Sequence, residues 1–148
     1  MGLSEEIPDG SSVAFDTDSI IYFVERHPVF HPIVAPVFRR AAAATITPFI
    51  SVVSLVEVLT LPLRQKIEHL VASYRELLDD DANGFETTPV TQAVANRAAE
   101  LRARWNLGTP DAIIAATAIE TSCTHLVTND PAFRRVENLK VLVVSDYT

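Results

Sequence analysis

Residues 109–118 read TPDAIIAATA, and this stretch indicates more about the fold than any other part of the chain. Thr109 followed by Pro110 is typical of a helix start, with a cap residue before a proline at the first helical position. The helix expected from Asp111 to about Thr121 is dense in alanine and has little polar surface. Asp111 is therefore an acidic residue at the start of an apolar helix. Its role is best judged from its position relative to the other acidic residues.

The stretch lies within an alternation of strand-like and helical patterns. Short apolar runs predict strands, and the segments between them have the apolar spacing of helices. Such alternation is typical of a parallel sheet flanked by helices, so we expect an α/β fold. The expected strands are Val13–Phe15, 49–52, 85–88, 125–128 and 141–144.

The helices between these strands have recognisable starts and stops. Asp18 or Ser19 is the expected N-cap of the first helix, and Ser54 that of the helix after the second strand. Pro62 is expected to kink or restart the helix after the second strand. A long amphipathic stretch follows from Leu63 to Leu78. The other expected elements are a helix that begins among Pro28, Pro32 and Pro36 and runs to about Ala44, a turn over 79–84, and a helix from Thr91 to Trp105.

Length and composition fit one globular domain. The chain has 148 residues, 48 % of them apolar, and a mean hydropathy of +0.19; this is too apolar for a disordered chain. Its longest apolar runs are too short to cross a bilayer. We expect residues 1–12 to form a flexible leader and residues 13–148 a single domain. The lone cysteine, Cys123, suits a reducing cytoplasm. The sequence has no Cys/His cluster with zinc spacing, which leaves carboxylates as the plausible metal ligands.

The charge balance is acidic, with 12 basic against 19 acidic side chains and a net charge of −7. Nucleic-acid binding usually leaves a basic footprint, so this balance argues against a nucleic-acid partner. Acidity concentrated in a metal site is partly neutralised by the bound ion, however. The distribution of the acids therefore matters more than their number.

Four acidic residues are predicted to meet at one edge of the sheet. Asp16 follows the first strand, and Asp130 comes just after the strand that ends at Thr128. Asp111 opens its helix, and Glu57 lies early in a helix that directly follows a strand. In an open parallel sheet, ligands bind outside the carboxyl ends of the strands. All four side chains can therefore point into one crevice.

A carboxylate cluster of this kind predicts a hard divalent cation. Clustered carboxylates repel one another, and Mg²⁺ held by carboxylates and water removes that conflict. Each aspartate alone has a structural explanation, as a cap, a turn former or a partner of a helix dipole. Glu57 has no such role and lies among apolar neighbours, where burial would be costly. The four positions taken together favour a metal site that activates water for phosphoryl chemistry.

The same residues resemble a known family, the PIN domain, and within it the VapC-like ribonuclease toxins. The resemblance rests on four blocks in the family's order, which span residues 13 to 133: VAFDTDS at 13–19, ISVVSLVEVL at 50–59, TPDAIIAATA at 109–118 and LVTNDPAF at 126–133. It implies a three-layer α/β/α sandwich around a parallel sheet of four or five strands. It also implies Mg²⁺-dependent cleavage of RNA phosphodiesters, with Mn²⁺ as a substitute metal.

The resemblance also implies roles for individual residues and partners. Asp16 and Asp111 would be the principal metal ligands, Glu57 and Asp130 would complete the cluster, and Thr128 or Asn129 would assist. A cognate antitoxin, an RNA substrate and a homodimer would be the partners. Many relatives carry a neutral residue where this chain has Asp18, for which we expect helix capping. Weak candidates for contacts with RNA phosphates are the pairs Arg39-Arg40 and Arg134-Arg135.

Two other functions remain open from the sequence. Asp16-Thr17-Asp18 after an apolar strand is similar to the opening of haloacid-dehalogenase-type phosphatases, in which the first aspartate is the nucleophile. That reading needs a lysine for the phosphate, and the chain offers only Lys66 and Lys140. The other is a non-catalytic PIN-like module that binds RNA or protein, although the chain retains all four acids.

Overall fold

The computed structural model describes residues 1–78 and 84–148, and its centre is a parallel sheet. The strand order is β3-β2-β1-β4-β5, and every pairing among these five strands is parallel. Ala14 of the central strand is level with Phe49 on one neighbour and Leu126 on the other. The expected parallel sheet of four or five strands is confirmed, with β1 Ser12–Phe15, β2 Thr47–Ser51, β3 Thr87–Thr88, β4 His125–Thr128 and β5 Lys140–Val143.

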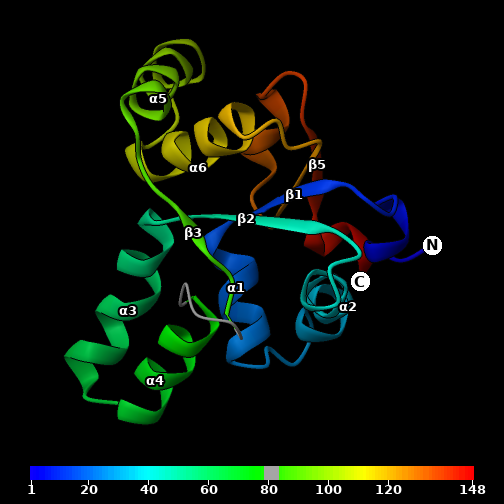
Figure 1. The fold of residues 1–148 in the computed structure, drawn as a ribbon, viewed down its shortest axis with the longest axis vertical. Helices are drawn as coiled ribbons and strands as arrows, with labels where there is room; N and C mark the ends of the chain where they lie inside the picture. Colours follow the sequence, from blue (N-terminus) through cyan, green and yellow to red (C-terminus); the bar gives the residue numbers. More distant parts are fainter. Residues whose placement is uncertain (79–83) are drawn as a thin grey trace.

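Helices cover both faces of this sheet, as Figure 1 shows, which makes three layers. α5 and α6 lie on one face, and α1 to α4 lie on the other. Alternate side chains of a strand point to opposite faces. Val13 and Phe15 accordingly join the core under α1 and α2, while Ala14 joins the core under α6. The bounds are α1 Thr17–Val24, α2 His31–Ala42, α3 Val53–Gln65, α4 Glu68–Leu77, α5 Gln92–Trp105 and α6 Thr109–Glu120.

Part of the first twelve residues packs against the domain, in the segment where a flexible leader was expected. Leu3 and Ile7 flank a short 3-10 helix, η1 Ser4–Glu6, and both are buried in the core. Arg40 holds the segment from α2 by donating to the carbonyl oxygens of Ser4 and Ile7, at 2.6 and 2.8 Å. Glu5 and Glu6, which lie between Leu3 and Ile7, made the segment look too polar to contribute to the core.

Two helix boundaries also differ from the prediction. Pro62 lies inside α3, and the chain breaks instead at Lys66, which is left-handed with φ 57°. The amide of Ile67 donates to the Pro62 carbonyl at 3.0 Å and closes this helix end. Ser54 is not a cap, because α3 begins one residue earlier and its N-cap is Val52. The predicted turn over 79–84 falls largely on residues 79–83, outside the described part of the chain.

None of the helices among the described residues has the length and apolar character needed to cross a bilayer.

Candidate metal centre

The candidate site begins where β1 and β4 end side by side. Asp16 directly follows β1, and its amide donates to the Val127 carbonyl of β4 at 2.9 Å. Asp130 lies two residues past the end of β4 and caps the short 3-10 helix η2 Pro131–Arg135 by accepting from Ala132 N at 2.9 Å. The pairing of the two strands therefore brings both aspartates to the carboxyl edge of the sheet.

Asp16 is the most deeply placed acid of the site, with an exposed fraction of 6 %. Its Oδ1 accepts from the Thr17 amide at 2.8 Å, which makes it the N-cap of α1. Its Oδ2 accepts from Thr128 Oγ1 at 2.7 Å. Burial, followed by the negative charge of Asp18, raises the pKa of Asp16 to about 7 despite these two hydrogen bonds.

Glu57 and Asp111 are brought toward the site by helices α3 and α6. Thr17 Oγ1 donates to Glu57 Oε1 at 2.6 Å, and the hydroxyl of Ser54 lies 2.9 Å from the same Thr17 oxygen. Asp111, in the first turn of α6, is partly buried, and burial is the main cause of its raised pKa. The charges of Asp130 and Glu57 raise that pKa further. Asp111 therefore interacts electrostatically with each of the other three predicted acids.

Glu57 is exposed, so the cost of burial expected from its apolar neighbours does not arise. The neighbours themselves are the reason, because part of the apolar surface of α3 faces outward. Val56 is 65 % exposed and Leu61 is 53 % exposed. The apolar run around Glu57 thus marks an uncovered helix surface as well as a core contact.

Asp18 is a fifth acid of the site, and sequence reasoning assigned it to helix capping. Asp16 performs that role, whereas Asp18 Oδ2 accepts from the backbone amide of Asn129 at 2.8 Å. Its Oδ1 is buried and has no hydrogen-bond partner in the described residues. Burial raises the pKa of Asp18 to about 6, and the charges of Asp130 and Asp111 add to the effect. The sequence signal that could have identified it is the position of Asp18, two residues after Asp16 at the end of the first strand.

Thr128 and Asn129 support the acids from behind. Thr128 is fully buried, and its hydroxyl donates to Asp16 while accepting from the Asp130 amide at 3.0 Å. The side chain of Asn129 is occupied elsewhere: its Nδ2 donates to Tyr22 Oη at 3.2 Å, and its Oδ1 accepts from the Ser145 amide at 2.9 Å. Both residues therefore orient the acids, Thr128 directly and Asn129 through its backbone.

The donor set fits a hard divalent cation. The charges that raise the pKa values of Asp16, Asp18 and Asp111 are all negative, and no positive charge among the described residues offsets them. The unpartnered Asp18 oxygen adds a buried acceptor. Within the described residues, however, no three metal-ligating side chains are already grouped closely enough to hold an ion. The chemistry of these carboxylates fits a hard divalent cation, and side-chain movements would have to bring them together around it.

The candidate arginines are engaged elsewhere or lie at another edge. Arg39 and Arg40 are in the last turn of α2, which leads to the amino end of β2, at the opposite edge of the sheet from the acids. Arg40 also pairs with Asp9 at 2.8 Å, so phosphate contact does not fit it. Arg134 pairs with Asp146, and Arg135 donates to the Trp105 carbonyl at 3.2 Å.

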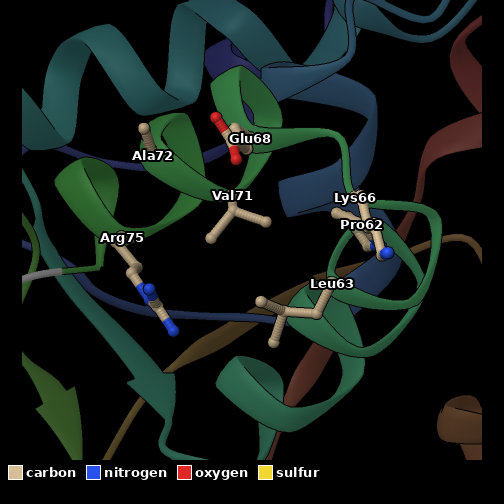
Figure 2. Close-up of a pocket in the computed structure, with 7 residues that line it drawn as sticks. All are labelled: Pro62, Leu63, Lys66, Glu68, Val71, Ala72 and Arg75. Atoms are coloured by element: carbon tan, nitrogen blue, oxygen red, sulfur yellow. The ribbon is translucent and has the colours of Figure 1, made fainter.

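A separate hollow of about 510 Å³ lies between α3 and α4 (Figure 2). Leu63 and Val71 point into it from the two helices. None of the five acids lines the hollow, so it is distinct from the metal site. Its lining is Pro62, Leu63, Lys66, Glu68, Val71, Ala72 and Arg75.

The fold is a parallel α/β/α sandwich that carries acids just after β1 and β4 and on α3 and α6. The sequence model of the PIN domain matches residues 13–139, and the chain belongs to this family. A search of curated protein sequences found no match.

Solved structures of toxin–antitoxin complexes share the fold. VapBC2 from Rickettsia felis, bound to a promoter DNA fragment, has a TM-score of 0.72 at 22 % identity, with 89 % of this chain and 98 % of that chain covered. VapBC-5 from Mycobacterium tuberculosis has a TM-score of 0.61 at 19 % identity, covering 90 % and 99 %. VapC20 from M. tuberculosis, described as a sarcin–ricin loop cleaving toxin, has a TM-score of 0.61 at 16 % identity, covering 77 % and 86 %. The resemblance to VapC proteins is confirmed for the fold.

Proposed function

We propose that this chain is a Mg²⁺-dependent endoribonuclease that hydrolyses RNA phosphodiester bonds. The observation that carries the proposal is that Asp111 interacts with Asp16, Glu57 and Asp130 near the carboxyl edge of the sheet, with no positive charge among the described residues to offset these acids. Membership of the PIN family and a fold shared with an RNA-cleaving toxin support the same activity. A bound Mg²⁺ would polarise the phosphoryl oxygen and activate water, with Asp16 and Asp111 as principal ligands.

The direct test is cleavage of total RNA by the purified chain in Mg²⁺, Mn²⁺ or EDTA. We expect cleavage with either metal, none in EDTA, and none by Asp111→Asn in any buffer. Glu76→Gln, an exposed acid on α4, is the matched control and should cleave like the unchanged chain. Equal cleavage by the unchanged chain and Asp111→Asn would contradict the proposal, because it would point to a contaminating nuclease.

The phosphatase alternative has less support. Both carboxylate oxygens of Asp16 already accept hydrogen bonds, from Thr17 N and Thr128 Oγ1. Lys140 begins β5 and so lies at the amino edge of the sheet, whereas Lys66 ends α3 beside the hollow of Figure 2. Neither lysine is placed to hold a phosphate at Asp16. Stable phosphorylation of Asp16 would revive this alternative, and an intact site that never cleaves RNA would favour a binding module.

We further propose that the chain is the toxin of a toxin–antitoxin pair and that its partner is an antitoxin with a basic segment. The solved structures that share the fold include complexes with antitoxins. The acidic net charge of −7 complements a basic partner, and exposed Val56, Leu61 and Leu63 on α3 offer it apolar contacts.

Mixing with the product of a neighbouring gene tests this partnership. RNA cleavage should be inhibited, and Val56→Asp should weaken the inhibition while leaving cleavage by the free chain unchanged. Undiminished cleavage at a molar excess of that protein would count against the pair. By the same resemblance we propose a homodimer, which a molar mass near twice 16.2 kDa from light scattering would support.

A further inference from the structure

Asp18 occupies a place in the fold where a carboxylate has no structural need to be charged. It is the second residue of α1, and Asp16 already caps that helix. Asp18 accepts a hydrogen bond from the Asn129 amide, at 2.8 Å, and this bond uses only Oδ2. An asparagine could accept the same bond without a charge. The role of the second oxygen, Oδ1, therefore needs another explanation.

That oxygen is buried and has no partner among the described residues, and it lies in a negative environment. The carboxylates of Asp16, Asp111 and Asp130 all act on Asp18 or are acted on by it. A buried, unpaired carboxylate oxygen is unfavourable, and surrounding negative charges make it more so. A cation shared with the neighbouring acids would remove the conflict.

The anchoring of Asp18 has the form expected around a metal ligand. Ligating carboxylates are usually held by a hydrogen bond from outside the metal's own shell. The Asn129 amide supplies that bond, and the Asn129 side chain fixes the loop by contacting both Tyr22 Oη and the Ser145 amide. One oxygen of Asp18 is thus anchored, and the other has no hydrogen-bond partner among the described residues.

We propose that Asp18 is a fifth carboxylate of the metal centre and that its Oδ1 is a ligand for the divalent cation beside Asp16. The proposal rests on the metal-dependent function proposed above. It assigns to this chain a ligand at a position where many PIN-domain relatives are neutral. Asn129 then acts as the positioning residue that holds this ligand.

The test is calorimetric titration of the metal-free chain with Mn²⁺, which measures binding without measuring cleavage. The variants are Asp18→Asn, Asp18→Ala and Asp111→Asn, with Glu76→Gln as the control for loss of one negative charge. We expect Asp18→Asn to weaken Mn²⁺ binding at least about tenfold, as loss of even an outer-shell partner costs 10–100-fold. Its unfolding midpoint without metal should be unchanged or higher, and Glu76→Gln should bind like the unchanged chain.

The outcomes separate this inference from the proposed function. If Asp111→Asn weakens Mn²⁺ binding and Asp18→Asn does not, the assignment of Asp18 is overturned and the metal site stands. If Asp18→Ala weakens binding but Asp18→Asn does not, Asp18 only ties the loop through Asn129, and the assignment again fails. If the unchanged chain binds no Mn²⁺, both the assignment and the metal-dependent function fall.

Discussion

The acids that follow β1 and β4 are held differently from those on α3 and α6. Asp16 has an exposed fraction of 6 % and accepts two hydrogen bonds, and Asp130 caps η2. Glu57 is exposed and is held by one hydrogen bond from Thr17, while Asp111 is partly buried. Strand pairing fixes the first pair, which we call the strand half, through the backbone. The second pair, the helix half, is only as fixed as the packing of its two helices.

This difference shows that the two halves contribute differently to metal binding. The strand half carries the buried charge that destabilises the metal-free fold, and the helix half carries the side chains that can move. The strand half carries buried negative charge whose pKa is raised to about 7 at Asp16, so it is destabilising when no cation is present. The helix half carries its charge nearer to solvent and can move toward a cation. Variants in the two halves should therefore affect activity alike but stability differently.

The largest effects are expected for Asp16→Asn and Glu57→Gln. Each should lower the rate of RNA cleavage at least about a hundredfold, because each removes an acid of the metal cluster. In EDTA at pH 8, Asp16→Asn should raise the free energy of unfolding by about 1–2 kcal/mol, since it removes a buried charge. Glu57→Gln should change it by less than about 0.5 kcal/mol, as expected for an exposed side chain. Urea unfolding measures both, and equal stability changes would contradict the division into halves.

The second prediction concerns pH. The pKa of Asp16 is raised to about 7, whereas an aspartate in the unfolded chain titrates near 4. Between these values the folded chain holds a proton that the unfolded chain has lost, so the free energy of unfolding should fall as pH rises from about 4 to about 7. The full pKa shift of Asp16 sets an upper limit of about 4 kcal/mol on this fall in the absence of metal.

Urea unfolding in EDTA at each pH, for the unchanged chain and Asp16→Asn, isolates this contribution. The comparison is needed because other groups titrate in the same range: burial raises the pKa of Asp18 to about 6 and lowers that of His125. As pH rises, the free energy of unfolding of Asp16→Asn should increase relative to that of the unchanged chain. A difference that is constant with pH would show that Asp16 is ionised throughout.

Much of the strand half could be predicted from the sequence, because strand ends are marked by apolar runs. A parallel sheet brings such ends to one edge, so Asp16 and Asp130 followed from Val13–Phe15 and 125–128 alone. The position of Asp111 followed from the helix start at Thr109-Pro110. Their mutual electrostatic influence is what the structure adds.

The features that were missed depend on contacts between distant segments. Nothing local shows that Ser54 pairs with Thr17 instead of capping α3, or that the Asn129 amide anchors Asp18. The burial of Leu3 depends on α2, which also supplies Arg40 to hold the segment. The exposure of Glu57 depends on which face of α3 packs against the core. Because apolar residues flank Glu57 on both sides, the sequence does not show which face that is.

Thr128→Val should have an intermediate effect confined to the strand half. It removes the hydrogen bond to Asp16 Oδ2 and leaves the Asp130 amide without its 3.0 Å acceptor, at nearly unchanged volume. We expect a loss of about 2 kcal/mol in the free energy of unfolding and about a tenfold slower cleavage. Thr128→Ser keeps the hydroxyl and should retain most of both quantities. Equal losses in the two variants would assign the effect to packing.

The smallest effect is expected at the link between the halves, Thr17. Its hydroxyl contacts Glu57 Oε1 at 2.6 Å and Ser54 Oγ at 2.9 Å, while its amide donates to Asp16. Thr17→Val keeps the amide and the shape but frees Glu57, so we expect a several-fold loss of cleavage and a stability loss of about 1 kcal/mol from the unpaired Ser54.

A double-mutant cycle with Glu57→Gln shows whether the link works through Glu57. If Thr17 acts by orienting that carboxylate, its substitution should cost little further activity once Glu57 is already changed, giving a coupling of about 1 kcal/mol in the activation free energy. Additive losses would mean that Thr17 acts on Asp16 through α1 instead. In that case the helix half would be positioned by helix packing alone, and the two halves would be independent until a cation joins them.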